Sequence, residues 1–479
     1  MNKKQTVFQT EFKDYQGTRI AAWNKVAQHS PSSWGGYYRR RLQTVFHLAI
    51  PKGVRVMEIG CGRGDLLAAL KPSIGVGIDF APEMVAQAQA SYPDLVFHVA
   101  DVHVLELGGQ QFDFIVLSDV INDLWDLQAA LEKLRPCCTP ATRLVFNFFS
   151  HLWQLPLAMA QTLGVATPTQ PQNWFTRHDL GNLLALSGFE ALRDWEEVVA
   201  PLPLPGISYF SNRFLSKLVP FRWFAMTNFL VARSSALSVK APTVSVVVAA
   251  RNEEGHIDEL LARIPEMGGG TEIVFVEGNS TDDTWGAIER AIVDHPQRNC
   301  KLLKQPGKGK GDAVRTGFDA ATGDILMILD ADITVPPEDL PRFYEILASG
   351  RGEFANGVRL VYPMQDDAMR FANIIGNKFF SWAFSLLLGQ SIRDTLCGTK
   401  VLWAKDYRRL TANRAYFGDF DPFGDFDLLF GAAKLNLKIM EVPIRYRARR
   451  YGETNIQRWR HGLLLLRMVL FAARRIKFV

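Results

Sequence analysis

Short apolar runs alternate with amphipathic stretches along most of this chain. The segments 54–58 and 244–249 are apolar and bounded by polar or glycine residues, a pattern typical of buried strands. Stretches with helical periodicity, such as 82–91 and 283–294, follow these runs. Strands that alternate with helices in this way predict mostly parallel sheets with helices on both faces.

The alternation occurs twice, with a change of composition between the two parts. Residues 198–206 (VVAPLPLPG) are proline-rich and lead into the apolar stretch 224–233. The small, polar stretch SSALSVKAPT (234–243) that follows is typical of a short linker. A chain of 479 residues is also too long for one ordinary core. We therefore predict two α/β domains in series, at residues 1–236 and 243–479, joined by a linker at 237–242.

Composition indicates a folded protein in a reducing compartment. Hydrophobic residues make up 48% of the chain and charged residues 22%, as in globular proteins. The net charge of +5 is small and spread along the chain, so it predicts no nucleic-acid partner. The five cysteines lack the spacing of a metal site or a disulfide framework. No signal peptide is recognisable, and no apolar run reaches the ~20 residues that cross a bilayer, so we expect a cytoplasmic protein.

A glycine-rich loop follows the first strand. Residues 54–70 predict a strand, a loop and a helix, with Gly60, Gly62 and Gly64 in the loop. Glycines allow positive φ and let the backbone approach a ligand, and the helix start supplies amide donors. The second strand ends at Asp79, where an acidic side chain can bind ribose hydroxyls.

Five motifs in order, MEIGCGRG, GVGIDFAPEMV, HVAD, QFDFIVLSDVIND and LRPCCTPATRLVFNFFS, resemble those of class I S-adenosylmethionine-dependent methyltransferases. The resemblance covers about residues 37–233 and implies a Rossmann-like methyltransferase fold with S-adenosylmethionine as cofactor. It assigns cofactor binding to Glu58, Gly60, Gly62, Gly64, Asp79, Phe80, Asp101, Val102 and Ser118. Asn122–Asp123 replaces the Glu–His often found in these enzymes, and no catalytic base is evident, so the methylated atom stays open.

Two carboxylates follow an apolar strand in the stretch DILMILDADITVPPEDL (324–340). The strand 325–330 ends at Asp330, and Asp332 comes two residues later. Open α/β sheets bind ligands at the carboxyl ends of their strands. Hard cations bind one or two carboxylates together with substrate phosphates. This pattern predicts that Asp330 and Asp332 hold Mg²⁺ or Mn²⁺ against a diphosphate.

The second half carries six ordered motifs, ARNEE, VEGNSTDDT, GKGDAVRTGF, LDADITVPPEDL, RDTLCGTK and IMEVPIRYRARRYGET. They resemble family-2 inverting glycosyltransferases of the GT-A fold, in particular dolichyl-phosphate mannose synthases and other polyprenyl-phosphate glycosyltransferases. The resemblance implies a nucleotide-diphosphate sugar donor, with Asp330 on the ribose or metal and Asp332 as the metal ligand. It places Arg251, Asn252, Glu253 and Glu277 at the nucleotide, and Lys310, Arg359, Arg393 and Arg449 at the phosphates.

Three departures from the family pattern leave the nucleotide base and the sugar open. Glu277-Gly278-Asn279-Ser280 stands where Asp-Asp-Gly-Ser is common. Thr334 and Asn455 replace a glutamine and a lysine of the dolichyl-phosphate mannose synthases. The acceptor is open as well, and a polyprenyl phosphate is one candidate.

Asp425 and Asp427 precede a predicted helix and are candidates for the catalytic base. An acceptor hydroxyl needs a general base, whereas a phosphate acceptor is already ionised at neutral pH. The alternative use of either side chain is to cap the helix.

The C-terminal stretch RWRHGLLLLRMVLFAARRIKFV mixes arginines with leucines. It can lie on an anionic membrane surface or pack on the core of its own domain. From all these features we predict a bifunctional enzyme, a methyltransferase fused to a glycosyltransferase. The alternatives are a glycosyltransferase with a non-catalytic docking domain, and a non-catalytic nucleotide-binding scaffold.

Overall fold

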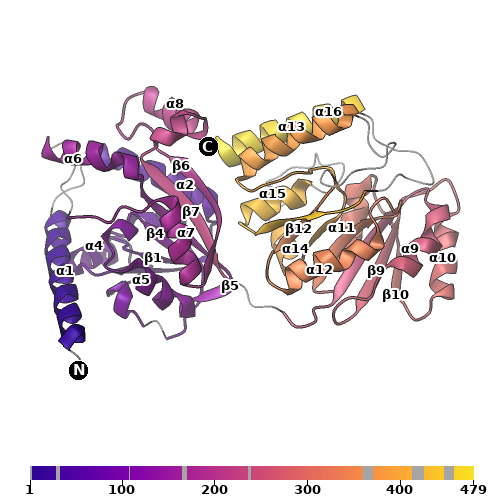
Figure 1. Cartoon of the computed structure of the whole chain (residues 1–479), viewed down its shortest axis with the longest axis horizontal. Helices are drawn as coiled ribbons and strands as arrows, with labels where there is room; N and C mark the ends of the chain where they lie inside the picture. The colour runs from indigo at the N-terminus through magenta and orange to yellow at the C-terminus, as the bar shows by residue number, and fades with distance from the viewer. Residues whose placement is uncertain are drawn as a thin grey trace. The chain divides into compact units, whose positions relative to one another are not determined.

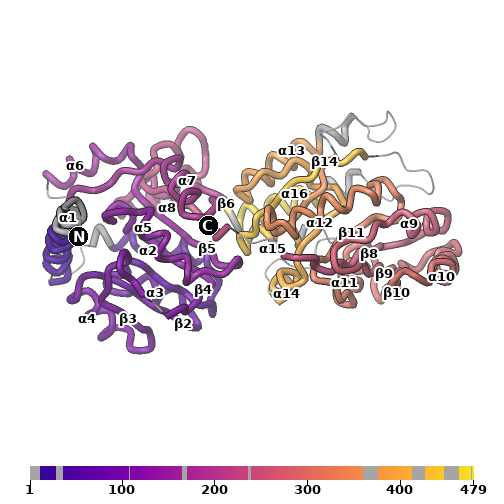
Figure 2. Tube along the Cα trace, turned by 60° about the horizontal axis from the view of Figure 1, so that its bottom comes forward, coloured from indigo at the N-terminus to yellow at the C-terminus, as the bar shows by residue number. Residues whose placement is uncertain are grey.

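The chain forms two compact units, Met1–Ser235 and Ala236–Lys477, shown in Figures 1 and 2. The computed structural model describes residues 3–28, 33–106, 108–163, 170–235, 239–359, 371–412, 426–446 and 458–478. Each unit is a mixed sheet flanked by helices, which confirms the predicted class of two α/β domains in series. The predicted linker, 237–242, begins next to the division between the units.

The first unit contains a seven-stranded sheet with strand order β3-β2-β1-β4-β5-β7-β6. Its strands are β1 (Arg55–Ile59), β2 (Ile74–Asp79), β3 (Val96–Val99), β4 (Phe112–Ser118), β5 (Cys138–Phe149), β6 (Phe189–Glu197) and β7 (Thr227–Ser234). Strands β1 to β5 are parallel, and β7 is antiparallel to both β5 and β6. The carboxyl ends of β1 to β6 therefore share one edge of the sheet, called here the ligand edge.

Helices cover both faces of this sheet. They are α1 (Lys3–Ala27), α2 (Ser33–Ala49), α3 (Asp65–Leu70), α4 (Pro82–Ser91), α5 (Leu127–Leu134), α6 (Gln154–Thr162), α7 (Arg177–Leu186) and α8 (Ile207–Arg213). Single turns lie at η1 (Val102–Val104), η2 (Ile121–Asp123), η3 (Arg135–Cys137), η4 (His151–Trp153), η5 (Leu215–Lys217) and η6 (Phe221–Phe224). Two buried apolar clusters form the core, consistent with a sheet that is covered twice. The predicted helix 82–91 is α4, and the predicted strand 54–58 is shifted by one residue.

The second unit contains another seven-stranded sheet, in the order β10-β9-β8-β11-β13-β12-β14. Its strands are β8 (Val244–Ala250), β9 (Thr271–Glu277), β10 (Asn299–Lys304), β11 (Ile325–Asp330), β12 (Phe354–Val358), β13 (Lys400–Trp403) and β14 (Ile439–Pro443). Strands β10, β9, β8 and β11 are parallel, while β13 is antiparallel to β11 and β12. The predicted strand 325–330 is β11, in the middle of the sheet.

The helices of this unit are α9 (Ile257–Arg263), α10 (Thr284–Asp294), α11 (Lys310–Ala320), α12 (Leu340–Ala348), α13 (Phe371–Leu388), α14 (Ala404–Ala412), α15 (Phe426–Lys434) and α16 (Arg458–Ala472). Two single turns are η7 (Glu254–His256) and η8 (Pro337–Asp339), and a π-helical turn, Ala473–Lys477, follows α16. Apolar residues from β8, β9 and β11 pack with α9 and α12 in one core. This core therefore supports β11, the strand that ends at Asp330.

The C-terminal helix α16 packs on its own domain, which is one of the two arrangements expected for it. Leu465, Met468 and Ala472 are buried, and the helix packs beside α13 (Figure 1). Leu463, Leu466 and Leu470 are 56%, 42% and 52% exposed. One face therefore packs on its own domain, and another face is apolar and open. None of the helices in the described ranges is long and apolar enough to cross a bilayer.

Candidate active sites

The glycine loop after β1 has the conformation that its sequence predicts. Gly60, Gly62 and Gly64 have φ of 70°, 50° and 78°. A Cβ on Gly60 would lie 2.6 Å from the Val120 side chain, so this backbone runs close to its neighbour. The Asp79 carboxylate accepts hydrogen bonds from the Gly62 amide at 2.9 Å and the Ala81 amide at 2.9 Å. Asp79 therefore ties the loop to the end of β2, and burial raises its pKa.

One cavity lies at the ligand edge of the first sheet. Five of the predicted cofactor residues line it: Gly60, Asp79, Phe80, Asp101 and Val102. They come from the ends of the first three strands, which lie side by side in the sheet. The structure thus brings the loop, the acidic residue of β2 and the residues after β3 to one place.

The other predicted cofactor residues do not line this cavity but lie in the loop and strands that form it. Gly62 and Gly64 shape the loop, and Ser118 ends β4 in register with Asn147 of β5. Glu58 is 2% exposed, and burial raises its pKa well above the usual range. Its Oε2 atom has no hydrogen-bond partner among the described residues.

Helix α1 closes one side of the cavity, which the sequence interpretation missed. Gln16 Nε2 donates to Asp101 Oδ2 at 2.9 Å, and Trp23 Nε1 donates to Asp123 Oδ2 at 2.9 Å. Arg19 Nη2 lies 3.5 Å from Asp123 Oδ1. The resemblance started at about residue 37, and α1 has only a weak amphipathic pattern, so no local signal marked these side chains.

Asp119, the residue after β4, was not predicted to be a site residue. Its φ of 52° is in the left-handed region, which aspartate adopts at a cost. Tyr38 Oη and Asn147 Nδ2 donate to its Oδ1 at 3.0 and 2.5 Å. Burial nevertheless raises the pKa of Asp119 to about 7. A carboxyl group that titrates near neutral pH at the ligand edge is suited to proton transfer.

In the second unit, Asp330 lies in a tight group at the end of β11. Lys310 Nζ, at the first residue of α11, is 2.6 Å from Asp330 Oδ1. The loop before β13 passes close by, because a Cβ on Gly398 would lie 2.2 Å from Asp330 Oδ2 and 2.4 Å from Lys310 Nζ. Position 398 therefore accepts only glycine without displacing this pair.

Asp332 lies beyond the strand end, beside an aromatic ring. Its Oδ1 accepts hydrogen bonds from the Thr334 hydroxyl at 2.8 Å and the Thr334 amide at 3.2 Å. Tyr446 lies nearby: burial raises its pKa, and the carboxylates of Asp332 and Asp330 add to that increase. Thr334, which departs from the family pattern, thus orients the predicted metal ligand.

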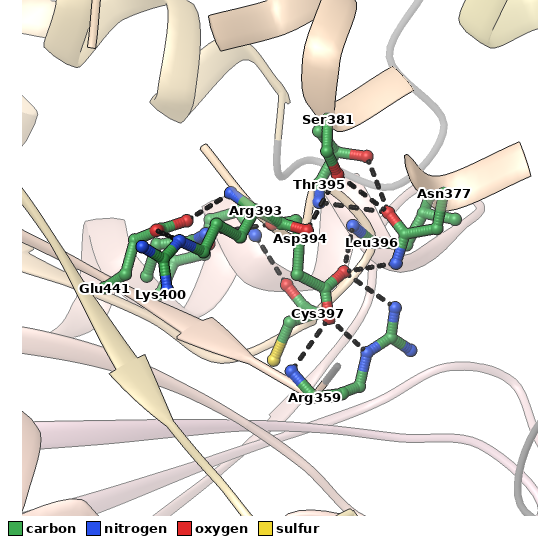
Figure 3. Close-up of polar contacts among 11 residues, drawn as sticks. Arg359, Asn377, Ser381, Arg393, Asp394, Thr395, Leu396, Cys397, Lys400 and Glu441 are labelled. Carbon is green, nitrogen blue, oxygen red and sulfur yellow. Dashed lines mark hydrogen bonds and ion pairs between the residues drawn. The ribbon is translucent and has the colours of Figure 1, made fainter. Parts of the chain in front are cut away.

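Arg359 holds a buried ion pair, and Figure 3 shows the contacts around it. Its Nε and Nη2 donate to Asp394 at 2.7 and 2.9 Å, and its amide donates at 3.0 Å. Asp394 is fully buried and also accepts from Asn377 Nδ2 and the Leu396 amide. Its pKa is lowered, because the Arg359 charge and these hydrogen bonds outweigh the effect of burial. Asp394 thus balances the charge of Arg359 inside the protein. This buried partner was not expected from the phosphate-facing role predicted for Arg359.

The predicted nucleotide residues form two linked loops after β8 and β9. Asn252 Oδ1 accepts from the Thr281 amide at 2.7 Å, and Glu277 accepts from the Ser280 amide at 2.5 Å. Glu253 is buried, with its Oε2 2.9 Å from His256 Nδ1. Arg251 is exposed. Asn252 and Glu253 shape the loop, and among these residues the exposed Arg251 has the freest access to a ligand.

Two of the remaining predicted residues, Arg393 and Asp427, have contacts of their own. The Arg393 side chain is 69% exposed, with Nε 3.7 Å from Glu441 Oε2. Asp427 is at the start of α15 and accepts from the Leu428 amide at 2.8 Å. Asp425 and Arg449 lie outside the described residues. Within the described ranges no three His, Cys, Asp or Glu side chains form a metal site by themselves.

Comparison with known proteins agrees with this division. Residues 34–193 match the family model described as "Methyltransferase domain", and residues 245–424 match "Glycosyl transferase family 2". A curated relative is the dolichol-phosphate mannosyltransferase of Pyrococcus furiosus, 35% identical over 224 residues. That match covers 45% of this chain and 59% of the relative, so the chain spans little more than half of the relative's length.

Two solved structures are similar to the two halves. Glucosyl-3-phosphoglycerate synthase from Mycobacterium tuberculosis has 20% identity and a TM-score of 0.36, covering 49% of this chain and 80% of its own. Magnesium protoporphyrin IX methyltransferase from Synechocystis has 18% identity and a TM-score of 0.32, covering 47% of this chain and 100% of its own. On the two family models alone, residues 34–193 form a methyltransferase domain and residues 245–424 a glycosyltransferase domain of family 2.

Proposed function

We propose that the C-terminal domain transfers a sugar, with inversion, from a nucleotide-diphosphate sugar to a polyprenyl-phosphate acceptor. We further propose that the N-terminal domain methylates a related substrate with S-adenosylmethionine. The observation that carries the proposal is the group at the end of β11. There, Asp330 contacts Lys310 beside the backbone of Gly398, and Asp332 follows Asp330 by two residues. The relative from Pyrococcus furiosus, named for a dolichol phosphate, supports the choice of acceptor.

The residues at this edge fit a divalent cation. Asp330 and Asp332 are hard oxygen ligands two residues apart, and Mg²⁺ or Mn²⁺ binds to one or two carboxylates plus substrate phosphates. The lack of a third protein ligand among the described residues is therefore expected for such a site. When bound, the cation supplies Lewis-acid stabilisation of the departing diphosphate.

The side chains around the cation site have distinct roles in this proposal. Lys310 neutralises part of the diphosphate charge and keeps Asp330 in place through their 2.6 Å contact. Thr334 fixes the rotamer of Asp332. Gly398 lets the Asp330–Lys310 pair lie directly against the backbone of its loop. A phosphate acceptor is already ionised, so Asp427 is needed as a base only for a hydroxyl acceptor.

In the N-terminal domain, the cavity below α1 is the proposed cofactor site. Asp79 would accept from the ribose hydroxyls, while Asp101 and Val102 would flank the adenine. The Asp101 pKa is lowered, because hydrogen bonds from His103 and Gln16 outweigh the effect of burial. Bound S-adenosylmethionine supplies an electrophilic methyl group. Asp119, with its raised pKa, is placed to hold or receive a proton at the same edge.

We also propose that the C-terminal domain associates peripherally with the cytoplasmic face of a membrane. The exposed face of α16 carries Leu463, Leu466 and Leu470, and Arg467 lies among them. Amphipathic helices with basic residues bind anionic lipid surfaces in this way. A polyprenyl phosphate is itself a membrane lipid, so this contact would bring the enzyme to its acceptor.

The decisive experiment is Asp332→Asn, assayed with nucleotide sugars, Mn²⁺ and a polyprenyl phosphate. This change keeps the side chain's size but removes one charge from the cation site. Glycosyl transfer should fall at least ~100-fold, or ~2.7 kcal/mol on the barrier, while S-adenosylmethionine binding persists. Asp294→Asn, an exposed change at the end of α10, is the control. Full metal-dependent transfer by Asp332→Asn would contradict the metal assignment.

Thermal-shift titrations separate this proposal from the two alternatives. A ligand that binds only the folded state raises the melting temperature. The proposal expects shifts with S-adenosylmethionine and with nucleotide sugar plus Mn²⁺, together with turnover of both. Binding of both without turnover would indicate a scaffold, and no response to S-adenosylmethionine would indicate a docking domain.

A further inference from the structure

Two segments of the methyltransferase domain expose apolar side chains at its ligand edge. The first is η4 with α6, which follows the end of β5, and the second is residues 198–226, which connect β6 to β7. Because β6 runs parallel to β5, both segments leave the sheet where the glycine loop and Asp79 lie. In Figure 1, α6 and α8 both lie at the upper side of this domain.

The exposure of these side chains is large. Leu152, Leu155 and Met159 are 66%, 76% and 64% exposed, and α6 buries none of its residues. In the second segment Phe221, Trp223 and Phe224 are 45%, 56% and 62% exposed. The Trp153 indole donates to the Phe224 carbonyl at 2.9 Å, so the two segments meet. These six exposed residues define the α6–η6 surface.

Hydrogen bonds hold the second segment in this position. The Met226 amide donates to the Val198 carbonyl at 2.8 Å, which closes the base of the segment. Asn212 Nδ2 donates to the Ala200 carbonyl at 2.7 Å, and its Oδ1 accepts from the Ala200 amide at 2.9 Å. Lys217 is buried against Glu197 of β6. These polar groups of the segment thus form hydrogen bonds or ion pairs within the domain, while its aromatic rings are exposed.

The charged side chains of the two segments, Arg213, Lys217 and Arg222, are all basic. The sequence contains no Asp or Glu from 133 to 178 and none from 198 to 252. Arg213 and Arg222 lie in the second segment, and the Arg213 guanidinium is 5.4 Å from the Tyr209 ring. Exposed Trp, Tyr and Phe combined with arginine, without acidic residues, match the interface of an anionic bilayer.

We propose that the α6–η6 surface docks the methyltransferase domain on an anionic lipid bilayer. This inference stands apart from the glycosyltransferase assignment, because it concerns only residues of the first domain. Docking through this surface turns the ligand edge, with the glycine loop and Asp119, toward the lipid headgroups. The methyl acceptor is then an amphiphilic molecule anchored in the membrane.

The test uses the full-length protein and sedimentation with vesicles of phosphatidylcholine containing about one quarter phosphatidylglycerol. The variant Phe221→Ser/Trp223→Ser/Phe224→Ser should lower the partition coefficient at least tenfold. Raised salt should weaken binding of the parent protein. The matched control is Ile74→Ser/Val96→Ser/Val99→Ser, which removes side chains that are 47%, 48% and 55% exposed on β2 and β3. That control should bind as the parent does.

A third variant separates this surface from the tail helix. Leu463→Ser/Leu466→Ser/Leu470→Ser changes the exposed face of α16 in the other domain. If only this variant loses vesicle binding, the α6–η6 surface is not a docking site and the inference is wrong. Absence of any binding by the parent also overturns it. The inference is also wrong if light scattering shows a concentration-dependent dimer that the Phe221/Trp223/Phe224 changes abolish while vesicle binding is unaffected. In that case the surface is an interface between two copies of the chain. Circular dichroism and S-adenosylmethionine affinity show that each variant is folded.

Discussion

The Asp394 carboxylate accepts two hydrogen bonds from the Arg359 guanidinium, at 2.7 and 2.9 Å, in the interior of the glycosyltransferase domain. The same carboxylate accepts from Asn377 of α13 and from the Leu396 amide (Figure 3). Two residues beyond Leu396, the chain reaches Gly398 beside Asp330 and Lys310. One buried carboxylate therefore fixes both Arg359 and the loop that borders the predicted cation site.

Asp394→Asn should destabilise the glycosyltransferase domain by about 3–5 kcal/mol, because it leaves the Arg359 charge buried without its counter-ion. Urea denaturation measures this loss. Adding Arg359→Met should restore part of it, because the unpaired charge is then gone. The exposed pair Arg351–Glu345, 3.4 Å apart, is the control, and Glu345→Gln should cost less than about 1 kcal/mol. Equal costs at both sites would show that the Asp394 pair is not an interior one.

Gly398→Ala should impair glycosyl transfer without unfolding the protein. The new methyl group would overlap Asp330 Oδ2 and Lys310 Nζ, and both atoms end side chains that can move. We expect a loss of less than about 2 kcal/mol in stability, as overpacking typically costs. We expect a fall of at least ~10-fold in kcat/KM, since the displaced carboxylate no longer meets the cation.

Gly376→Ala is the matched control for this change, since a Cβ there meets nothing within 4 Å. It lies in α13 and should leave transfer unchanged, with a small gain in stability from helix propensity. Normal transfer by Gly398→Ala would show that the Asp330–Lys310 contact is not part of the reaction site.

Asp79→Ala should weaken S-adenosylmethionine binding by roughly 1–3 kcal/mol, the contribution of a hydrogen bond to a charged group. The Gly62 amide also loses its acceptor, so the loss should lie toward the upper end of this range. Isothermal titration calorimetry measures it. Nucleotide-sugar affinity should not change, and Asp332→Asn should show the opposite pattern. A parallel loss of both affinities would contradict two independent sites.

Asp119→Asn should change the pH dependence of stability. An unfolded aspartate has a pKa near ~3.9, whereas the pKa of Asp119 in the fold is about 7. The native state therefore binds more protons between these values, and Asp119 lowers stability progressively as pH rises from 4 to 7. The asparagine variant lacks this penalty, so it should gain up to about 4 kcal/mol on the parent between pH 4 and pH 8.

Urea denaturation at several pH values tests the Asp119 prediction. Asp94→Asn, on the surface of the same domain, serves as the control and should follow the parent at every pH. A difference between the Asp119 variant and the parent that is constant with pH would show that burial does not shift this carboxyl group.

Features that depend on local pattern could be predicted from the sequence. The strand that ends at Asp330 and the helix 82–91 agree with the structure, because apolar periodicity and chain breaks decide such elements locally. The family resemblance assigned Asp79 and Asp101 to one ligand, and both line the same cavity.

Features that depend on tertiary packing could not be predicted. In the motif RDTLCGTK, Arg393 received a role at the phosphates, yet its neighbour Asp394 is the buried residue. The sequence does not show which of two adjacent charged side chains is buried, because tertiary packing decides this. Helix α1 escaped notice for a similar reason: its contacts with Asp101 and Asp123 join positions about 80 to 100 residues apart, beyond the reach of local pattern.

The antiparallel course of β7 has a consequence for how the two domains are tethered. Because β7 runs against β5, it ends at the edge of its sheet opposite the cofactor cavity. Strand β8 likewise starts at the edge of its own sheet opposite Asp330. The tether therefore joins each sheet at the edge opposite its proposed site. A longer or shorter tether would therefore leave unchanged the strand ends that carry Asp79 and Asp330.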